Sequence, residues 1–160
     1  MQKENHFDEL RFIRQIRYQK LGADGQQKLS LAHVGIVGCG ALGSATAVAL
    51  TRAGIGNLTI IDRDVPEWSN LPRQILYTEK DVHDGLPKAI IAERRLKEID
   101  SNLHVISHVA DLTAHNISDL LSAVDIIVDG TDNFETRFLM NDFACHENIP
   151  WIYGGVIGAE

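Results

Sequence analysis

The alternation of apolar and polar positions along the chain predicts strands and helices that follow one another in turn. Short runs rich in β-branched residues have the length of single buried strands, and the longer segments between them repeat their apolar residues at helical spacing. This order is typical of the α/β class, in which a mostly parallel sheet carries helices on both faces. The predicted strands are 33–38, 58–62, 103–109, 124–132 and 150–156, and the helices between them are 41–54, 87–99, 116–123 and 133–148.

Two shorter helical segments come before the first strand. Residues 7–20 predict a helix with an apolar stripe, and residues 22–32 predict a second one. The stripe consists of Phe12, Ile13 and Ile16. We therefore divide the chain into an N-terminal helical arm, 1–31, and an α/β domain, 32–160. The sequence ends directly beyond the last predicted strand, so we expect this domain to be truncated at its C-terminal side, with a short natural chain as the alternative.

Length and charge narrow the function classes. A chain of 160 residues suits one globular core, and a formal net charge of −7 argues against an extended nucleic-acid surface. No run reaches the roughly 18 apolar residues of a membrane span, and the start lacks the apolar core of a signal peptide. We therefore expect a cytoplasmic protein that binds neither membrane nor nucleic acid. Cys39 and Cys145 form no CxxC pair, so we expect packing roles for both.

A glycine-rich loop, "GCGALG", joins the first predicted strand to the next helix. Gly38, Gly40 and Gly43 permit a tight turn and close approach of phosphate, and the backbone at Gly40 and Ala41 opens a helix whose N-terminus favours an anion. This context predicts a Rossmann-like nucleotide site; a glycine turn needed only for packing is the alternative. Asp62 ends the second strand, where such folds place the acid that binds the ribose hydroxyls.

The residues of the loop after Asp62 argue against NAD as the ligand. An NAD-dependent oxidoreductase would account for the glycine loop and Asp62, but it leaves the polar residues of "DRDVPEWSNLPRQ" without a role. Asn70, Arg73 and Gln74 lie near the carboxyl ends of the strands, where an arginine suits bidentate phosphate contact. Lys88 adds positive charge at the start of the next helix. These residues favour ATP as the ligand.

The fourth predicted strand ends in "DGTDN" and carries Asp129, Asp132 and Asn133 to the same edge of the sheet. A carboxylate opposite a phosphate loop is a plausible ligand for Mg²⁺, which binds proteins through one or two carboxylates together with substrate phosphates. We assign this role to Asp132; a helix N-cap is its alternative role. A site for a triphosphate and a metal predicts nucleotidyl transfer, which needs positioning and charge neutralisation without a protein nucleophile.

These motifs resemble those of the adenylating domain of the ThiF/MoeB and ubiquitin-activating enzyme superfamily. The matching pieces follow the family's order along nearly all of the chain: "RFIRQI", "GCGALGS", "GIGNLTIIDRD", "SNLPRQILY", "GLPKA" and "DGTDNFETR". The resemblance implies an adenylyltransferase that uses ATP and Mg²⁺. Its substrate would be the C-terminal glycine carboxylate of a ubiquitin-like sulfur-carrier protein, in thiamine or molybdopterin biosynthesis, and pyrophosphate would be released.

The resemblance also implies roles for single residues. Asp62 would hold the ribose, with Asp64 in the adjoining loop. Asp132 would bind the metal, accompanied by Asn133 and Arg137. The residues that would surround the phosphates are Asn70, Arg73, Gln74 and Lys88.

Arg14 is implied to act in another subunit. The family's "RxxRQ" element places an arginine at the ATP of the neighbouring chain, which predicts a homodimer; from the residues alone, Arg14 is an exposed helical charge. The catalytic set is then Arg14, Arg73, Lys88 and Asp132. The attacking carboxylate is already ionised, so we expect no histidine base. Zinc is expected only if CxxC pairs follow downstream, and the remaining alternatives are an NAD-dependent oxidoreductase and a non-catalytic nucleotide-binding or dimerisation module.

Overall fold

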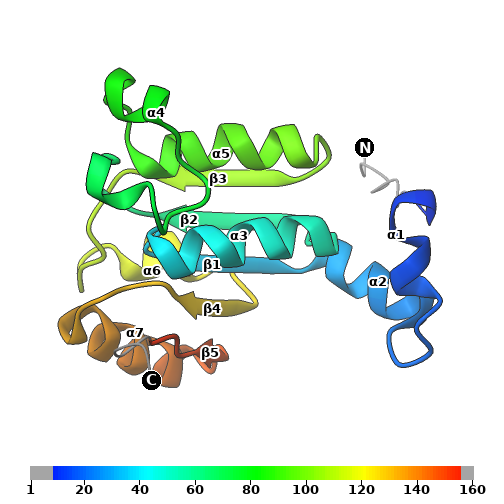
Figure 1. The fold of residues 1–160 in the computed structure, drawn as a ribbon. Helices are drawn as coiled ribbons and strands as arrows, with labels where there is room; N and C mark the ends of the chain where they lie inside the picture. The colour runs from blue at the N-terminus through cyan, green and yellow to red at the C-terminus, as the bar shows by residue number, and fades with distance from the viewer. Residues whose placement is uncertain (1–8, 156–160) are drawn as a thin grey trace, which may run out of the picture.

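The computed structural model describes residues 9–155 of the chain. Five parallel strands form one sheet in the order β3-β2-β1-β4-β5 (Figure 1). The strands are β1 (His33–Val37), β2 (Asn57–Ile61), β3 (His104–His108), β4 (Ile126–Asp129) and β5 (Trp151–Ile152). This arrangement confirms the α/β class and the parallel sheet predicted from the sequence.

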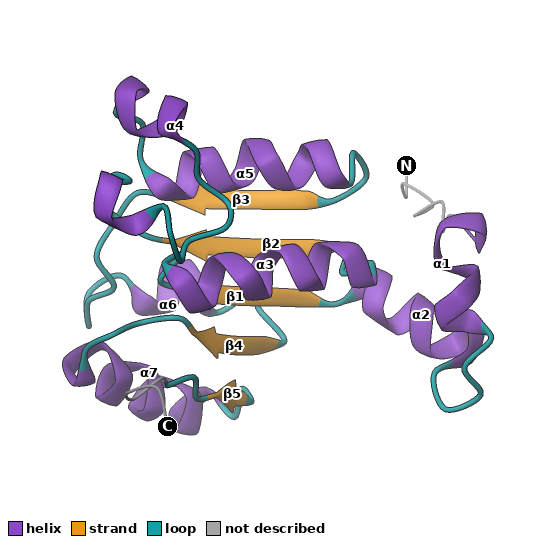
Figure 2. Cartoon of the chain, viewed as in Figure 1, coloured by secondary structure: helices purple, strands orange, loops and turns teal. Residues whose placement is uncertain are grey.

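Helices cover both faces of the sheet (Figure 2). The pair α3 (Ala41–Ala53) and α5 (Lys88–Ile99) packs on one face, and the pair α6 (Ile117–Leu121) and α7 (Phe134–Glu147) packs on the other. Successive strand residues point to opposite faces, so Ile36 and Ile60 join the first core cluster while Val37 and Ile61 join the second. The near-continuous apolar sequence of the strands follows from this two-sided burial.

The strand order creates a crevice beside the central strand. The chain runs outward from β1 to β2 and β3, then returns to place β4 on the other side of β1. The register aligns Val37 with both Ile61 and Asp129, so three strands end at the same level of one sheet edge. Ligands of open α/β sheets bind at such a switch point, outside the carboxyl ends of the strands.

The segment between β2 and α5 contains two short helices that the apolar pattern did not predict. They are the 3-10 helix η1 (Trp68–Asn70) and the helix α4 (Glu79–Asp84). Each begins with a reciprocal capping box, formed by Glu67 with Asn70 and by Thr78 with Asp81. Their stability therefore depends on local side-chain hydrogen bonds, which leave no periodic apolar stripe in the sequence.

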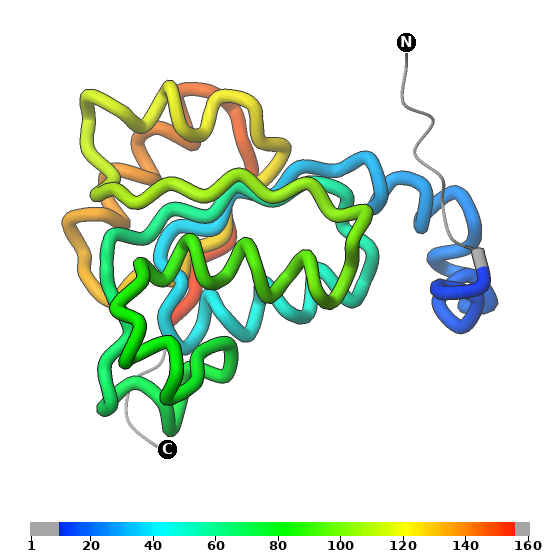
Figure 3. The backbone as a smooth tube through the Cα atoms, turned by 90° about the horizontal axis from the view of Figure 1, so that it is seen from above, coloured from blue at the N-terminus to red at the C-terminus, as the bar shows by residue number. Residues whose placement is uncertain are grey.

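The N-terminal arm consists of α1 (Glu9–Ile16) and α2 (Gly22–Leu31). The first helix is shorter than the predicted 7–20: turns replace it after Ile16, and residues 7 and 8 lie outside the described chain. The Gln15 and Gln26 amides both donate to the Ala53 carbonyl at the end of α3, over 2.9 and 2.7 Å. The arm is thereby fastened near the amino ends of the strands, far from the edge where the ligand crevice lies (Figure 1, Figure 3).

The structure also bears on three further expectations from the sequence. Within residues 9–155, no helix has the length and apolar character that a membrane crossing requires. Cys39 is buried, as expected for a packing role, whereas Cys145 is exposed on α7, so the packing role expected for it is wrong. Of the described residues of the predicted strand 150–156, only Trp151–Ile152 form a strand, because the chain continues directly into an irregular segment that contains two glycines.

Candidate functional site

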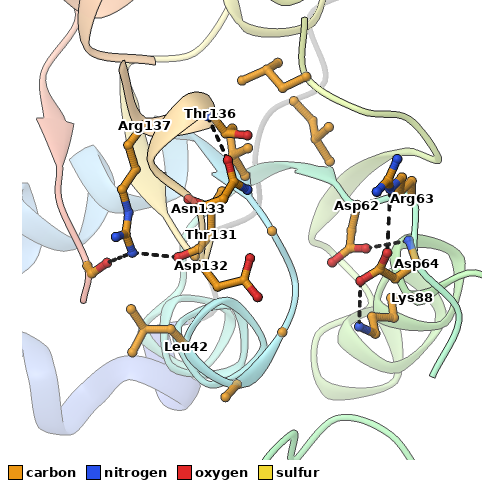
Figure 4. Close-up of a pocket in the computed structure, with 18 of the residues that line it drawn as sticks. Leu42, Asp62, Arg63, Asp64, Lys88, Thr131, Asp132, Asn133, Thr136 and Arg137 are labelled. Atoms are coloured by element: carbon orange, nitrogen blue, oxygen red, sulfur yellow. Dashed lines mark hydrogen bonds and ion pairs between the residues drawn. The ribbon is translucent and has the colours of Figure 1, made fainter. Parts of the chain in front are cut away.

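A pocket of about 630 Å³ opens at the carboxyl edge of the sheet (Figure 4). Its walls come from the loops that follow the first four strands, together with residues just past β5 and the first residue of α5. This volume lies in the usual range of small-molecule sites. Of the residues singled out from the sequence, the following line it: Gly38, Gly40, Ala41, Asp62, Asp64, Arg73, Gln74, Lys88, Asp132, Asn133 and Arg137.

The three glycines of the loop serve different purposes. Gly38 has a φ of +84°, and a Cβ on Gly43 would lie 1.9 Å from the Gly38 carbonyl oxygen, so these two glycines permit the turn and its packing on α3. A Cβ on Gly40 would meet nothing closer than the Gln74 amide nitrogen at 3.6 Å. The turn explains Gly38 and close packing explains Gly43, whereas neither explains Gly40, whose bare backbone faces the pocket.

A pair of alanine substitutions separates these purposes. Gly43→Ala is expected to lower the free energy of unfolding by about 3 kcal/mol, because the loop must move to admit the methyl group. Gly40→Ala is expected to cost about 1 kcal/mol or less, the usual loss at a helix N-cap, yet to weaken nucleotide binding about tenfold or more by its bulk in the pocket. Chemical denaturation and calorimetric titration with ATP measure the two effects. Equal destabilisation by both substitutions would contradict the assignment.

Asp62 links the glycine loop to the loop after β2. Its Oδ2 accepts a hydrogen bond from the Cys39 amide at 2.7 Å, and its Oδ1 accepts one from the Asp64 amide at 2.8 Å. Burial raises the pKa of the Asp62 carboxyl, and the two amides oppose that shift by stabilising the charged form. Each carboxylate oxygen retains a second lone pair, so this group can still accept hydrogen bonds from ribose hydroxyls.

Lys88 and Asp64 form an ion pair at the pocket wall. The Lys88 ammonium is almost completely buried and lies 3.1 Å from Asp64 Oδ2, while the Lys88 backbone amide donates to the Asp64 carbonyl at 2.7 Å. Next to them, Arg63 pairs with Asp111 at 2.7 Å across the pocket rim. The side chain of Asp64 is more than half exposed, so this ion pair does not seal the Lys88 ammonium off from the pocket. Lys88 therefore remains able to face an anionic ligand.

The loop that carries Asn70, Arg73 and Gln74 places them differently. Arg73 is exposed at the pocket and donates to the Ser69 carbonyl at 2.7 Å. Gln74 is buried in the wall, and its Oε1 has no hydrogen-bond partner within the described chain. Asn70 does not line the pocket; its Oδ1 accepts from the Glu67 amide, and its carbonyl accepts from the amides of Arg73 and Gln74. In this geometry Asn70 shapes the loop that presents the other two.

The structure excludes one of the two roles considered for Asp132. Asn133 is the N-cap of α7, because its Oδ1 accepts a hydrogen bond from the Thr136 amide at 2.9 Å. The exposed Asp132 carboxylate projects instead into the pocket, toward the side that holds Asp62 and Lys88 (Figure 4). Residues 9–155 contain no group of three or more metal-binding side chains. A single carboxylate in a pocket suits Mg²⁺ when a bound ligand supplies phosphates, because this ion takes its other ligands from phosphates and water.

Arg137 has a structural environment that its sequence motif did not reveal. Its guanidinium donates to Asp129 Oδ2 at 2.9 Å and to the carbonyls of Thr131 and Gly154 at 2.7 and 2.9 Å, and it stacks on the Tyr153 ring. Asp129 is fully buried, and its Oδ1 accepts from both the amide and hydroxyl of Thr131. This network holds the ends of β4 and β5 together and fixes the loop that presents Asp132.

Some residues that line the pocket were not singled out from the sequence, and Arg14, which was singled out, does not line it. The unpredicted lining includes Leu42, Arg63, Ala110, Leu112, Phe134 and Tyr153. Leu42, Arg63 and Phe134 stand inside quoted motifs whose other residues received the predicted roles. Ala110, Leu112 and Tyr153 belong to no motif and are recognisable only because parallel strands end just before them. Arg14 is exposed on α1 and does not line the pocket of its own chain. The helix α1 itself lies beyond the amino ends of the strands (Figure 1).

Comparison with known proteins gives the family. The sequence model of the ThiF family matches residues 12–160. The chain belongs to the ThiF family. It is 51% identical over 149 residues to the sulfur carrier protein ThiS adenylyltransferase of Bacillus subtilis, a match that covers 93% of this chain and 44% of that protein.

Two further relatives extend the likeness. The sulfur carrier protein adenylyltransferase of Thermus thermophilus is 38% identical over 146 residues, covering 91% of this ThiF-family chain and 53% of the relative. Among solved structures, the E. coli tRNA N6-threonylcarbamoyladenosine dehydratase, TcdA, in complex with ATP superposes with a TM-score of 0.83 at 29% identity, covering 89% of this chain and 58% of that one. The chain thus spans about half the length of these relatives.

Proposed function

We propose that the protein binds ATP with Mg²⁺ and transfers AMP to the C-terminal glycine carboxylate of a ubiquitin-like sulfur-carrier protein, releasing pyrophosphate. The observation that carries the proposal is the convergence of cationic and anionic side chains on one pocket. Lys88 and Arg73 line the side next to the glycine loop, and Asp132 projects into the same space without capping its helix. The similarity to two sulfur-carrier adenylyltransferases supports the choice of substrate.

In the proposed reaction, one oxygen of the carrier's carboxylate attacks the α-phosphorus of ATP. A new acyl–phosphate bond forms while the bond between the α-phosphorus and its bridging oxygen breaks, and that oxygen leaves with its electron pair as part of pyrophosphate. No proton needs to move, since the carboxylate is ionised at neutral pH. The protein's task is to bring an anion to a polyanion, which requires fixed positive charge and preorganised amide donors.

The residues of the pocket divide this task. Asp62 would accept hydrogen bonds from the ribose hydroxyls. The backbone amides of the glycine loop and of the first turn of α3 would donate hydrogen bonds to phosphate. Lys88 and Arg73 would bind the phosphates. The ion pair of Lys88 with Asp64 would weaken when the Lys88 ammonium binds phosphate. Asp132 would bind Mg²⁺, which, when present, neutralises phosphate charge. Arg137 would take no direct part, because its donors already bind Asp129, Thr131 and Gly154.

The proposal is tested by exchange of labelled pyrophosphate into ATP, with the complete gene product and a purified ubiquitin-like sulfur carrier. We expect exchange that depends on both Mg²⁺ and the carrier. A carrier whose C-terminal carboxylate is amidated is the matched control and should support none. Absence of exchange with every sulfur carrier of the host would refute the proposal, and tighter binding of NADH than of ATP·Mg²⁺ in calorimetry would favour an oxidoreductase instead.

A further inference from the structure

A single residue in the centre of the glycine loop is held from both sides by buried side chains. The Cys39 amide donates to Asp62 Oδ2 at 2.7 Å, and the Tyr77 hydroxyl donates to the Cys39 carbonyl at 2.7 Å. Cys39 is completely buried and Tyr77 almost so. Burial raises the pKa of the Cys39 thiol to about 12 and raises that of the Tyr77 hydroxyl, so both groups keep their protons at neutral pH. Tyr77 is therefore a permanent donor to the loop backbone.

This contact determines which way the next peptide amide points. No peptide bond among the described residues is cis, and in a trans peptide the carbonyl of one residue and the amide of the next point in opposite directions. Because the Tyr77 hydroxyl fixes the Cys39 carbonyl on the buried side, the Gly40 amide is turned to the other side, where Gly40 lines the pocket.

The earlier amides of the loop are already committed. The Gly38 amide donates to the Ile61 carbonyl at 2.8 Å, and the Cys39 amide donates to Asp62. In the described chain the Gly40 amide has no acceptor, and a Cβ on Gly40 would meet only the Gln74 amide nitrogen, at 3.6 Å. Gly40 therefore begins the set of backbone donors available to an anion, which continues into the first turn of α3.

Tyr77 also connects this loop to the segment that bears Arg73. The Asn70 carbonyl accepts from the amides of Arg73 and Gln74 at 3.1 and 2.9 Å, and the Gln74 carbonyl accepts from the Tyr77 amide at 3.2 Å. These turns make residues 70–77 a connected unit. The Tyr77 hydroxyl is a buried hydrogen bond from that unit to the glycine loop, so it sets the position of one phosphate-facing segment relative to the other.

We propose that Tyr77 is a positioning residue of the triphosphate site: its hydroxyl holds the Cys39 carbonyl so that the Gly40 amide and Arg73 address the same phosphates. The proposal rests on the ATP-binding function proposed above and deepens it. Tyr77 touches no part of the ligand itself, because it does not line the pocket. Its effect should therefore depend on whether the ligand carries phosphate.

Tyr77→Phe in the complete gene product removes the hydroxyl and keeps the ring. The buried Cys39 carbonyl loses its partner, and the peptide that presents the Gly40 amide becomes free to turn. We expect the Kd for ATP·Mg²⁺ and for AMP to rise about tenfold, while the Kd for adenosine changes less than about twofold. Calorimetric titration of the three ligands measures this. Tyr18→Phe, which changes an exposed tyrosine of the arm, is the matched control and should leave all three constants unchanged.

The wild-type protein provides a readout that does not depend on how well the variant folds. In amide NMR spectra, the Gly40 resonance should shift on addition of AMP or ATP·Mg²⁺ and stay in place with adenosine. Equal losses for adenosine and ATP in Tyr77→Phe, unchanged binding of all three ligands, or a Gly40 resonance that ignores phosphate would overturn the inference alone. Failure of the wild-type protein to bind ATP would overturn the proposed function together with it.

Discussion

Asp132→Ala is expected to reduce carrier-dependent pyrophosphate exchange about 1,000-fold while leaving the fold intact. The loss follows from the proposed role of Asp132: its removal would take away the carboxylate that would hold Mg²⁺, and with it the neutralisation of phosphate charge. The fold should persist because the side chain is exposed and the N-cap of α7 is Asn133. We expect the melting temperature to change by about 2 °C or less.

Two comparisons sharpen this test. Asp119→Ala changes an exposed carboxylate on α6, away from the pocket, and should leave exchange and melting temperature unchanged. In Asp132→Ala, the concentration of Mg²⁺ needed for half-maximal ATP binding should increase, a change that a purely structural role would not produce. If exchange survives in Asp132→Ala at the wild-type Mg²⁺ dependence, the metal assignment is wrong.

Arg14→Ala is expected to reduce exchange about 100-fold without destabilising the subunit that carries the substitution. In the homodimer that the sequence predicts, Arg14 would reach the phosphates of the neighbouring chain, where a missing cation would raise the barrier for an anion attacking a polyanion. Within one chain Arg14 is exposed on α1 and remote from the pocket, so its removal should leave the melting temperature unchanged. Arg17→Ala, which changes another exposed arginine in the turn after α1, is the control and should leave exchange unchanged.

Mixing the two inactive variants tests whether the site is shared. A dimer of one Arg14→Ala chain and one Asp132→Ala chain contains one site with both residues intact and one site with neither. Random mixing in equal amounts makes about half of all dimers mixed, so about a quarter of the wild-type activity should return. Recovery of activity requires subunit exchange, which size-tagged chains can verify. No recovery in verified mixed dimers would place Arg14 outside the partner's site.

The order of strands and helices was predictable because burial on two faces gives parallel strands continuous apolar sequences. The location of the candidate site was predictable for the same reason, since Asp62 directly follows β2 and Asp132 lies in the short loop after β4, and both strands end at the same edge of the sheet. The helices η1 and α4 were missed because their capping boxes produce no apolar periodicity. No sequence pattern indicated that Arg137 binds three backbone and side-chain oxygens, since those partners come from two separate strand ends.

The loop after β2 illustrates a second limit of the sequence. The residue types of Asn70 and Gln74 suggested the same role, yet one side chain caps a turn and the other lies in the pocket wall. Their different directions are set by the 3-10 turn between Trp68 and Asn70. Tyr77 ends the quoted motif "SNLPRQILY", but the motif does not reveal that its hydroxyl donates to a backbone carbonyl 38 positions earlier.

The attachment of the arm has a consequence for how the protein responds to ionic strength. Gln15 and Gln26 hold the end of α3 through neutral amides, and Phe12 is buried beside them, so salt does not screen these contacts. The partly exposed ion pair of Arg11 with Asp100 adds a component that salt does weaken. The arm should therefore stay docked on its own chain in concentrated salt. A fall in exchange activity under those conditions would report weaker attraction between the proposed cationic groups, Arg14 among them, and phosphate, and not detachment of the helix that carries Arg14.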